Sequence, residues 1–348
     1  MTNHYPFRYA SSYLRIVVLL FIALTATSSA ISIERQLGMR LNPDEAETEV
    51  LKWANGDIQL VGTLYLPAGR GPFPAALMLH GSGSLPRTDR IFREHAERLA
   101  RAGLAIFVYD KRGVGDSTGD WKQASLVDLA DDALGGLNLL RRHPKLLPNR
   151  IGFIGISQGP WVGDILISRS ETVAFAVWLS GTPVTPAEQG NYVIERALRS
   201  KGYDEAAIER AVKLNRQILD VYRTDRGWDE AATAVQSASS EAWFKDSGVG
   251  LQPRDSWNWQ WYRRFMDYDP VPTLKKLKIP LFAAFGGSDP LIPMDKSLRM
   301  LEELKRTGKD VTVVVIPNLG HDLGIRKGPQ PELYWTALEK WLREKRIV

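Results

Sequence analysis

Two spacings of hydrophobic residues alternate along most of the chain. Short runs in which nearly every residue is apolar, such as LAIFVY, are followed by stretches such as 91–100 in which apolar residues recur every three or four positions. The first spacing is typical of a strand buried on both faces, and the second of a helix with one buried side. The predicted strands are 73–81, 104–110, 150–156, 173–181, 279–287 and 310–317, and the predicted helices are 91–100, 123–142, a short one after 156, 296–307 and a C-terminal one.

This alternation of strands and helices predicts the class of the fold. Successive buried strands joined by helices form a mostly parallel sheet with helices on both faces. We therefore expect an α/β fold with a central sheet flanked by helices.

Two segments depart from this rhythm. In residues 48–69, two β-rich runs are separated by Asn55-Gly56, which predicts a hairpin whose two central residues both have positive φ. Residues 186–270 contain no apolar strand run, but 206–222 carries a helical stripe. We interpret 186–270 as a helical lid inserted between a first part of the core, 31–185, and a second part, 271–348.

The first thirty residues have the composition of an export signal. Arg8 and Arg15 precede an apolar run, and small residues end the segment at Ala30. We expect residues 1–30 to be removed, with no stable membrane insertion and a periplasmic or secreted protein. The alternative is an uncleaved anchor, because no charge lies between Arg15 and Glu34.

Composition narrows the classes of function. The chain has 348 residues, 44% of them hydrophobic and 24% charged, as globular proteins have. Its 45 basic and 40 acidic residues are interspersed, so the net charge of +5 is not concentrated on one segment. Nucleic-acid binding requires clustered basic residues, and we do not expect it.

The pattern G-x-S-x-G occurs twice, around Ser117 and around Ser157. A nucleophilic serine in an α/β sheet stands on a sharp turn between a strand and a helix, flanked by glycines that avoid clashes. Ser157 follows a predicted strand directly and precedes a helical pattern. Ser117 is separated from its preceding strand by several residues including glycines, so we interpret it as a turn residue and Ser157 as the nucleophile.

An acid and a base should follow the nucleophile on loops after later strands, in the order Ser, Asp or Glu, His. Asp289 follows the strand 279–287, and His321 follows the strand 310–317. For the acid, Asp295 and Asp322 compete, although Asp295 is better explained as a helix cap and Asp322 adjoins the base.

The turn His80-Gly81-Ser82-Gly83 ends a predicted strand. We expect the backbone N–H of Ser82 there, with that of Gln158, to form an oxyanion hole, and His80 to hold the turn by hydrogen bonds. The alternative is that this segment is only a tight turn and takes no part in catalysis.

The motifs HGSGS, YDKRGVGDSTG, GISQG, GGSDPLIP and GHD, in this order, resemble those of the α/β-hydrolase superfamily. The similarity is to the serine esterase branch that contains dienelactone-hydrolase-like and S33 aminopeptidase-like enzymes, and it covers about 45–185 and 271–345. It implies an α/β-hydrolase fold, a small-molecule ester substrate, no cofactor or metal, and a Ser157, Asp289, His321 triad. Pro160 departs from the pattern, since many relatives have a second glycine there.

We therefore expect a serine hydrolase that cleaves carboxylic esters through an acyl-enzyme. The alternatives are an exopeptidase or amidase, for which Glu188 and Glu195 are candidates to bind a peptide amine, and a hydrolase-like binding protein without turnover. The tryptophans between Trp228 and Trp261 indicate either an apolar substrate group or the core of the inserted segment. Fold alone does not choose a substrate.

Overall fold

A computed structural model describes residues 46–324 and 331–348, so the predicted signal peptide lies outside the described residues. The centre of the fold is an eight-stranded sheet in the order β1-β2-β4-β3-β5-β6-β7-β8. The pairs from β4 to β8 are parallel, while β1–β2 and β2–β4 are antiparallel. The strands are β1 Glu47–Asn55, β2 Ile58–Leu66, β3 Phe73–Leu79, β4 Ala105–Tyr109, β5 Leu146–Ile156, β6 Ala176–Leu179, β7 Leu281–Gly286 and β8 Val311–Ile316.

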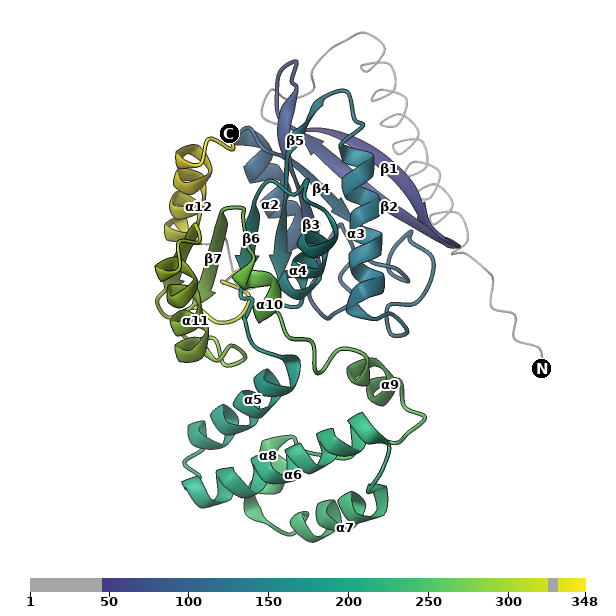
Figure 1. Cartoon of the computed structure of the whole chain (residues 1–348), viewed down its shortest axis with the longest axis vertical. Coiled ribbons are helices and arrows are strands. Elements are labelled where there is room, and N and C mark those ends of the chain that lie inside the picture. The colour runs from purple at the N-terminus through teal and green to yellow at the C-terminus, as the bar shows by residue number, and fades with distance from the viewer. Residues whose placement is uncertain (1–45, 325–330) are drawn as a thin grey trace, which may run out of the picture. The chain divides into compact units, whose positions relative to one another are not determined.

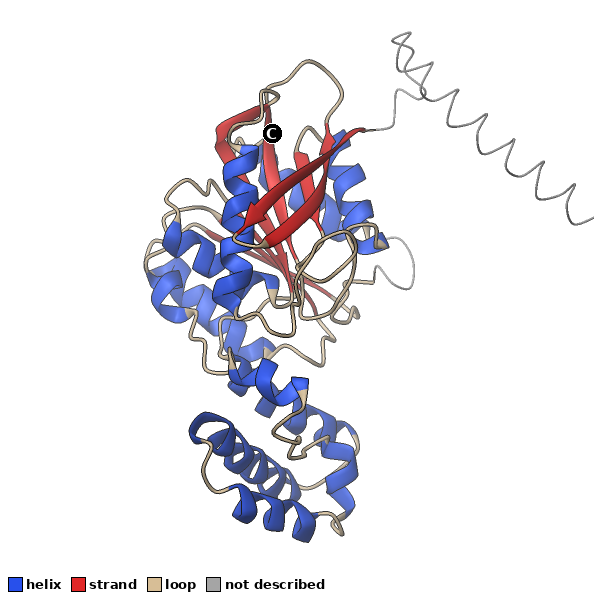
Figure 2. Cartoon of the chain, turned by 90° about the vertical axis from the view of Figure 1, so that its right-hand side faces the viewer, coloured by secondary structure: helices blue, strands red, loops and turns tan. Residues whose placement is uncertain are grey.

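Helices cover both faces of this sheet (Figure 2). One face packs against α2 (Arg90–Arg101) and α12 (Glu332–Glu344). The other packs against α3 (Leu126–Leu140), α4 (Gly159–Arg169), α10 (Val271–Lys275) and α11 (Met294–Arg306). The predicted sheet flanked by helices is confirmed.

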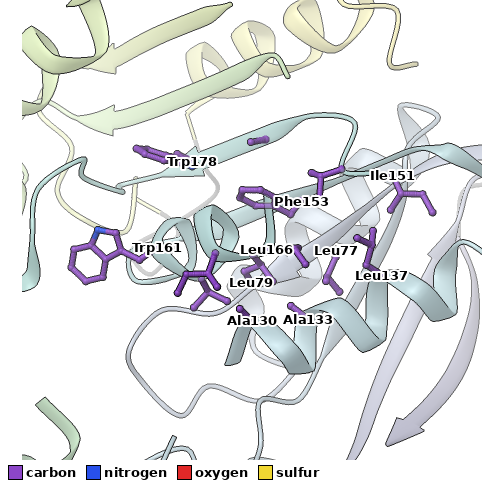
Figure 3. Packing of buried hydrophobic residues seen from close by; sticks show 14 of the residues in the cluster. Leu77, Leu79, Ala130, Ala133, Leu137, Ile151, Phe153, Trp161, Leu166 and Trp178 are labelled. Carbon is purple, nitrogen blue, oxygen red and sulfur yellow. The ribbon is translucent and has the colours of Figure 1, made fainter. Parts of the chain in front are cut away.

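The central strands are apolar throughout because both of their faces are covered. Leu77 and Leu79 of β3 point into the core on the α3 and α4 side, whereas Ala76 and Met78 belong to the core on the α2 and α12 side. Figure 3 shows Leu77 beside Phe153 of β5, facing the helices. Side chains alternate between faces along a strand, so a strand with two dry faces needs an unbroken apolar run.

The predicted hairpin forms, but its turn differs from the prediction. Asn55 pairs with Ile58 in the β1–β2 ladder, so the central residues are Gly56 and Asp57. Of these only Gly56 has positive φ, at 57°. The type I′ turn centred on Asn55-Gly56 is therefore wrong. The paired strands extend one residue further than the dipeptide indicated, which leaves glycine as the first turn residue.

Between β6 and α10 the chain forms a group of helices, α5 to α9, here called the helical insertion. It has its own hydrophobic core, in which Trp243 and Trp259 are buried. Figure 1 draws it as a separate group of helices beyond one edge of the α/β core. Its helices are α5 Pro186–Ser200, α6 Glu205–Thr224, α7 Trp228–Ala238, α8 Ala242–Ser247 and α9 Trp257–Arg263. No helix among the described residues has the length and apolar character that a membrane crossing requires.

One buried carboxyl in α4 opposes the stability of the fold. Asp164 is fully buried, and neither of its oxygens has a hydrogen-bond partner among the described residues. Burial raises the pKa of Asp164 well above its usual range, because the ionised form would lose its hydration. Asp132, by contrast, is buried but accepts two hydrogen bonds from Arg112, each 2.7 Å long.

This contrast predicts a pH-dependent gain in stability for Asp164→Asn. An unfolded aspartate ionises near pH 4, at a pKa of about 3.9. The folded chain holds the proton to higher pH, so its free energy of unfolding falls as pH rises above that value. We expect the variant and the wild type to have similar Tm near pH 4. At pH 8 the variant should melt higher, by about 2–4 °C for each kcal/mol of relieved cost.

Thermal melts followed by circular dichroism at several pH values test this expectation. Asp132→Asn is the matched control, because it makes the same chemical change at a carboxylate that has a cationic partner. We expect the control to melt lower than the wild type at pH 8. A Tm difference for Asp164→Asn that does not change between pH 4 and pH 8 would contradict the assignment.

Candidate active site

Ser157 stands at the junction of β5 and α4. Its backbone has a φ of 58°, a left-handed conformation that non-glycine residues rarely adopt. The strain is sustained by its surroundings, since the Ser157 N–H donates to the carbonyl of Leu179 on β6 over 2.9 Å. The turn from strand to helix is therefore as sharp as the sequence predicts.

The two glycines of the motif permit this turn. A Cβ on Gly155 would lie 2.7 Å from the backbone of Gly159, and a Cβ on Gly159 would lie 2.5 Å from the carbonyl oxygen of Leu79. Both distances are shorter than real Cβ contacts. Pro160 fits in the first turn of α4, where its missing N–H would have no helical partner. The second glycine of relatives is therefore not needed for a tight turn here.

The structure brings Asp289 and His321 to Ser157. His321 Nε2 lies 2.8 Å from Ser157 Oγ, and His321 Nδ1 lies 2.8 Å from Asp289 Oδ2. The other carboxylate oxygen of Asp289 accepts a hydrogen bond of 2.8 Å from the N–H of Leu291. The Asp289 side chain is inaccessible to solvent, while that of His321 is 24% exposed. The imidazole is thus held from one side by a buried carboxylate and directed at the serine by the other nitrogen.

The competing residues lie elsewhere. Ser117 is buried, donates from Oγ to the carbonyl of Asp110 over 2.7 Å, and accepts from the N–H of Val61 over 3.0 Å. Asp322 accepts from the N–H of Gly324, which closes its own turn. Asp295 is the second residue of α11 and makes no capping hydrogen bond, so its interpretation as a cap is wrong. Its charge instead lies in the first turn, where it interacts favourably with the helix dipole.

The loop after β3 lies against the nucleophile. A Cβ on Gly81 would be in ordinary contact with the Cβ of Ser157, at 3.4 Å. Ser82, Ser157 and Gln158 line the same cavity, and Gln158 is the N-cap of α4. Backbone N–H groups at a helix N-terminus are free of helical partners and attract negative charge.

His80 does not hold its turn by hydrogen bonds, in contrast to the prediction. Its ring packs edge-on against Phe92 and Tyr109, with centroids 4.6 and 4.9 Å away. Neither ring nitrogen has a partner in good hydrogen-bonding geometry within the described chain. Burial, assisted by the charge of Lys111, lowers the pKa of His80 to about 3, so the ring is neutral. It acts as an aromatic core residue.

A cavity of about 600 Å³ joins Ser157 to the helical insertion. Its wall combines apolar groups with uncharged polar ones, and no charged side chain lines it among the described residues. The lining from the insertion includes Gln189, Val193, Ile194, Asn215, Ile218, Leu219, Tyr222, Gln252, Asn258, Trp261 and Tyr262. Trp261 thus faces the cavity, whereas Trp243 and Trp259 belong to the core of the insertion.

Sequence reasoning named Trp261 as a possible substrate contact but missed the other cavity residues, and it also missed Lys111, which contacts the loop after β3. The helical stripe of α6 identifies a buried side, but it does not say whether that side meets other helices or a cavity. Lys111 carried a usable signal, because a lysine directly after a buried strand is unusual. Among the described residues, no three carboxylates and imidazoles gather as metal ligands.

Residues 74–325 match the family described as serine aminopeptidase, S33 (Hydrolase_4). The chain belongs to this family. The S33 family member shares its fold with solved α/β-hydrolases. It superimposes on the Pyrococcus furiosus esterase Pf2001 with a TM-score of 0.56 at 19% identity, covering 86% of this chain and 91% of that one. Est1E from Butyrivibrio proteoclasticus, solved with ferulic acid, gives a TM-score of 0.56 at 15% identity, covering 86% of this chain and 100% of that one.

The curated relatives of the S33 family member include an esterase and a thioesterase. It is 24% identical to esterase EstD of Thermotoga maritima over 325 residues, which are 92% of this chain and 70% of that protein. It is 24% identical to acyl-coenzyme A thioesterase 3 of Mus musculus over 198 residues, or 57% of this chain and 43% of that protein. It therefore spans less than half the length of that thioesterase. Family, fold and relatives together show that the chain is a hydrolase of the α/β-hydrolase superfamily.

The contacts of Ser117 predict a stability defect without loss of chemistry. In Ser117→Ala the buried N–H of Val61 loses its acceptor, which should lower the free energy of unfolding by about 1–3 kcal/mol. Because Ser117 does not contact Ser157 or His321, we expect kcat with a p-nitrophenyl ester to stay near that of the wild type. Urea unfolding and initial rates at 25 °C measure the two quantities. A large fall in kcat of the folded variant would count against the choice between the two serines.

Proposed function

We propose that this S33-family hydrolase cleaves uncharged carboxylic esters through an acyl-enzyme, with Ser157 as nucleophile, His321 as base and Asp289 as the residue that orients the imidazole. The observation that carries the proposal is the continuous hydrogen-bonded line from Asp289 Oδ2 through both nitrogens of His321 to Ser157 Oγ, with 2.8 Å at each step. A serine hydroxyl needs such a base to become nucleophilic at neutral pH.

The proposed first step forms the acyl-enzyme. Ser157 Oγ attacks the ester carbonyl carbon while His321 Nε2 takes the hydroxyl proton. The carbonyl oxygen becomes negative and receives hydrogen bonds from the N–H groups of Ser82 and Gln158. The carbon–oxygen bond to the alcohol then breaks, and His321 returns its proton to the leaving oxygen. Asp289 stabilises the transient imidazolium and fixes the tautomer with Nδ1 protonated.

The proposed second step releases the acid. A water molecule takes the place of the alcohol, loses a proton to His321 Nε2 and attacks the acyl carbon. The tetrahedral intermediate again directs its negative oxygen at Ser82 and Gln158. Its collapse breaks the bond to Ser157 Oγ, which regains the proton from His321.

The cavity favours an uncharged substrate with an apolar group. Its described lining is mainly apolar near Trp261, Tyr262 and Leu219, with uncharged amides such as Asn215 and Asn258 completing it. We infer that the helical insertion acts as a lid that holds the acyl or alcohol group of the ester. The relatives named esterases support this class of substrate.

An exopeptidase would need an anion in the cavity to bind the amine of its substrate, and neither candidate glutamate is placed to supply it. Glu188 closes a capping box with Thr185 and pairs with Lys296, and Glu195 pairs with Arg199 over 3.6 Å. Neither glutamate lines the cavity. An ammonium buried there would lose its hydration without gaining a described counter-charge. Export of the mature chain after removal of residues 1–30 stays part of the proposal.

Replacing the nucleophile tests the central assignment. Ser157→Ala should lower kcat for p-nitrophenyl butyrate by about 10⁶, to the residual rate that binding and the oxyanion hole support. Its Tm should not fall, because the hydrogen bond that the substitution removes, to His321 Nε2, is only partly buried. A fluorophosphonate probe should label the wild type on the peptide that contains Ser157. Labelling at another serine, or an active Ser157→Ala, would reject the proposal.

The uncharged cavity predicts discrimination by charge. The p-nitrophenyl esters of heptanoic acid and of 6-aminohexanoic acid have chains of the same length, but the second ends in an ammonium in place of a methyl group. Burying that charge without a partner costs several kcal/mol, so its kcat/KM should be lower by about 100-fold or more.

Leucine p-nitroanilide should be cleaved more slowly still. Initial rates at pH 7.5 compare the three substrates. Equal kcat/KM for the two esters, or a preference for the leucine anilide, would favour the exopeptidase instead.

A further inference from the structure

A buried lysine contacts the loop that we assign to the oxyanion hole. Lys111 follows β4 by two residues, is 2% exposed, and donates from Nζ to the carbonyl oxygen of Gly81 over 3.0 Å. Its ammonium also lies 4.7 Å from the centre of the Trp121 ring. Burial lowers the pKa of Lys111 to about 7, with no carboxylate close enough to oppose this. A buried ammonium without a carboxylate is costly, so its position calls for a function.

The peptide group that Lys111 contacts carries the proposed oxyanion donor. The carbonyl of Gly81 and the N–H of Ser82 belong to the same trans peptide unit, in which they point in opposite directions. A donor that fixes the carbonyl end therefore also fixes the direction of the N–H end. A Cβ on Gly81 would lie 3.4 Å from the Cβ of Ser157, and Ser82 lines the cavity with Ser157.

Below the pKa of about 7, where Lys111 is protonated, its charge at the carbonyl end also changes the strength of the donor. A charge-assisted hydrogen bond draws electron density toward the carbonyl oxygen, and hydrogen bonds in such a chain polarise one another. The N–H of Ser82 then binds a negative oxygen more strongly than a neutral ester carbonyl. This difference between transition state and ground state is what accelerates the chemical step.

We infer that Lys111 is a positioning residue of the oxyanion hole, which aligns and polarises the Gly81–Ser82 peptide for the tetrahedral intermediate. The inference rests on the proposed function and adds to it a residue that does not touch the substrate. Atoms and protons of the two acyl-transfer steps are unchanged, because Lys111 acts through a hydrogen bond only.

The residues before and after Lys111 in the sequence form ion pairs with other residues, so they do not neutralise the charge of Lys111. On one side, Asp110 accepts hydrogen bonds from the backbone and guanidinium of Arg87. On the other side, Arg112 pairs with Asp132 over 2.7 Å. These ions neutralise each other.

Trp121, over the ammonium, packs against Trp257 and Trp261 of α9 with ring centroids 5.6 and 5.7 Å apart. The helical insertion thus helps to keep water from the contact between Lys111 and Gly81.

Kinetics of Lys111→Met test the inference, with Lys122→Met as the matched control. Lys122 also places its ammonium over a tryptophan, 5.1 Å from the ring of Trp257, but it makes no contact with Gly81. The substrate is p-nitrophenyl butyrate at pH 6, where Lys111 is mostly protonated. Inhibition is measured with n-butylboronic acid, whose serine adduct is tetrahedral and negative, and with N-ethylbutanamide, a neutral analogue of the ground state. Circular dichroism verifies that each variant is folded.

We expect Lys111→Met to lower kcat by about 10-fold or more, below the 10²–10³ that loss of a whole donor costs. The boronic acid should bind more weakly by the same factor, while KM and the affinity for the amide should change by less than about twofold. Lys111→Gln, which keeps a donor without the charge, should recover part of kcat. Lys122→Met should resemble the wild type in all four quantities.

A folded Lys111→Met with the kcat and boronic acid affinity of the wild type would overturn the inference. So would a loss shared equally by the boronic acid and the amide, because that is the signature of a merely structural role. If Lys111→Met does not fold, the same comparison on Lys111→Gln decides.

The inference and the proposed function fail differently. An active Ser157→Ala rejects both, whereas an inactive Ser157→Ala beside a fully active Lys111→Met rejects the inference only.

Discussion

The structure depends on one close approach between backbone segments, where the turn after β5 presses against the end of β3. At this point only glycine fits at position 159, because the carbonyl of Leu79 occupies the space of a Cβ. The same crowding holds Ser157 in a left-handed conformation and directs its side chain out of the sheet. A sheet buried on both faces supplies the rigidity that maintains such strain. The reactive geometry is therefore a property of the central strands as much as of the loops.

Charged groups are distributed unevenly around Ser157. Asp289 is buried and receives two hydrogen bonds. The cavity wall is uncharged where it is described, and the cations near the loop after β4 are mostly paired. Lys111 differs from these, since it is buried and its partners are a carbonyl and an aromatic ring. In a medium of low polarity each of these arrangements has a larger effect on a developing negative charge than it would have in water.

Much of this could be predicted from the sequence, and the reasons are local. Strands such as β4 and β5 were identifiable because a strand that is covered on both faces of the sheet requires an unbroken apolar run. The juxtaposition of Ser157, Asp289 and His321 followed from the rule that loops after parallel strands meet at one edge of a sheet. The role of Ser117 as a turn residue followed from its distance from the strand before it.

Other features depended on tertiary contacts that a pattern does not encode. The register of the β1–β2 hairpin was set by the pairing of Asn55 with Ile58, not by the turn preference of the dipeptide. His80 packs against two aromatic rings from other elements, so its hydrogen-bonding role could not be judged from its neighbours in sequence. The cavity wall in α5 and α6 depends on how the inserted helices pack on each other.

The direct pairing of β6 with β7 has a consequence for how this architecture diversifies. The whole insertion leaves from one strand and returns to its immediate neighbour, with Leu179 opposite Ala284 in the ladder. Because β6 and β7 run parallel, the chain leaves the carboxyl end of β6 and enters β7 at the opposite, amino end, after crossing back through α10. A segment of another length and shape can make the same crossing without moving Ser157 relative to His321, because these residues follow β5 and β8. Exchange of the inserted helices then changes which substrates fit the cavity, while the sheet and the residues at its edge stay the same.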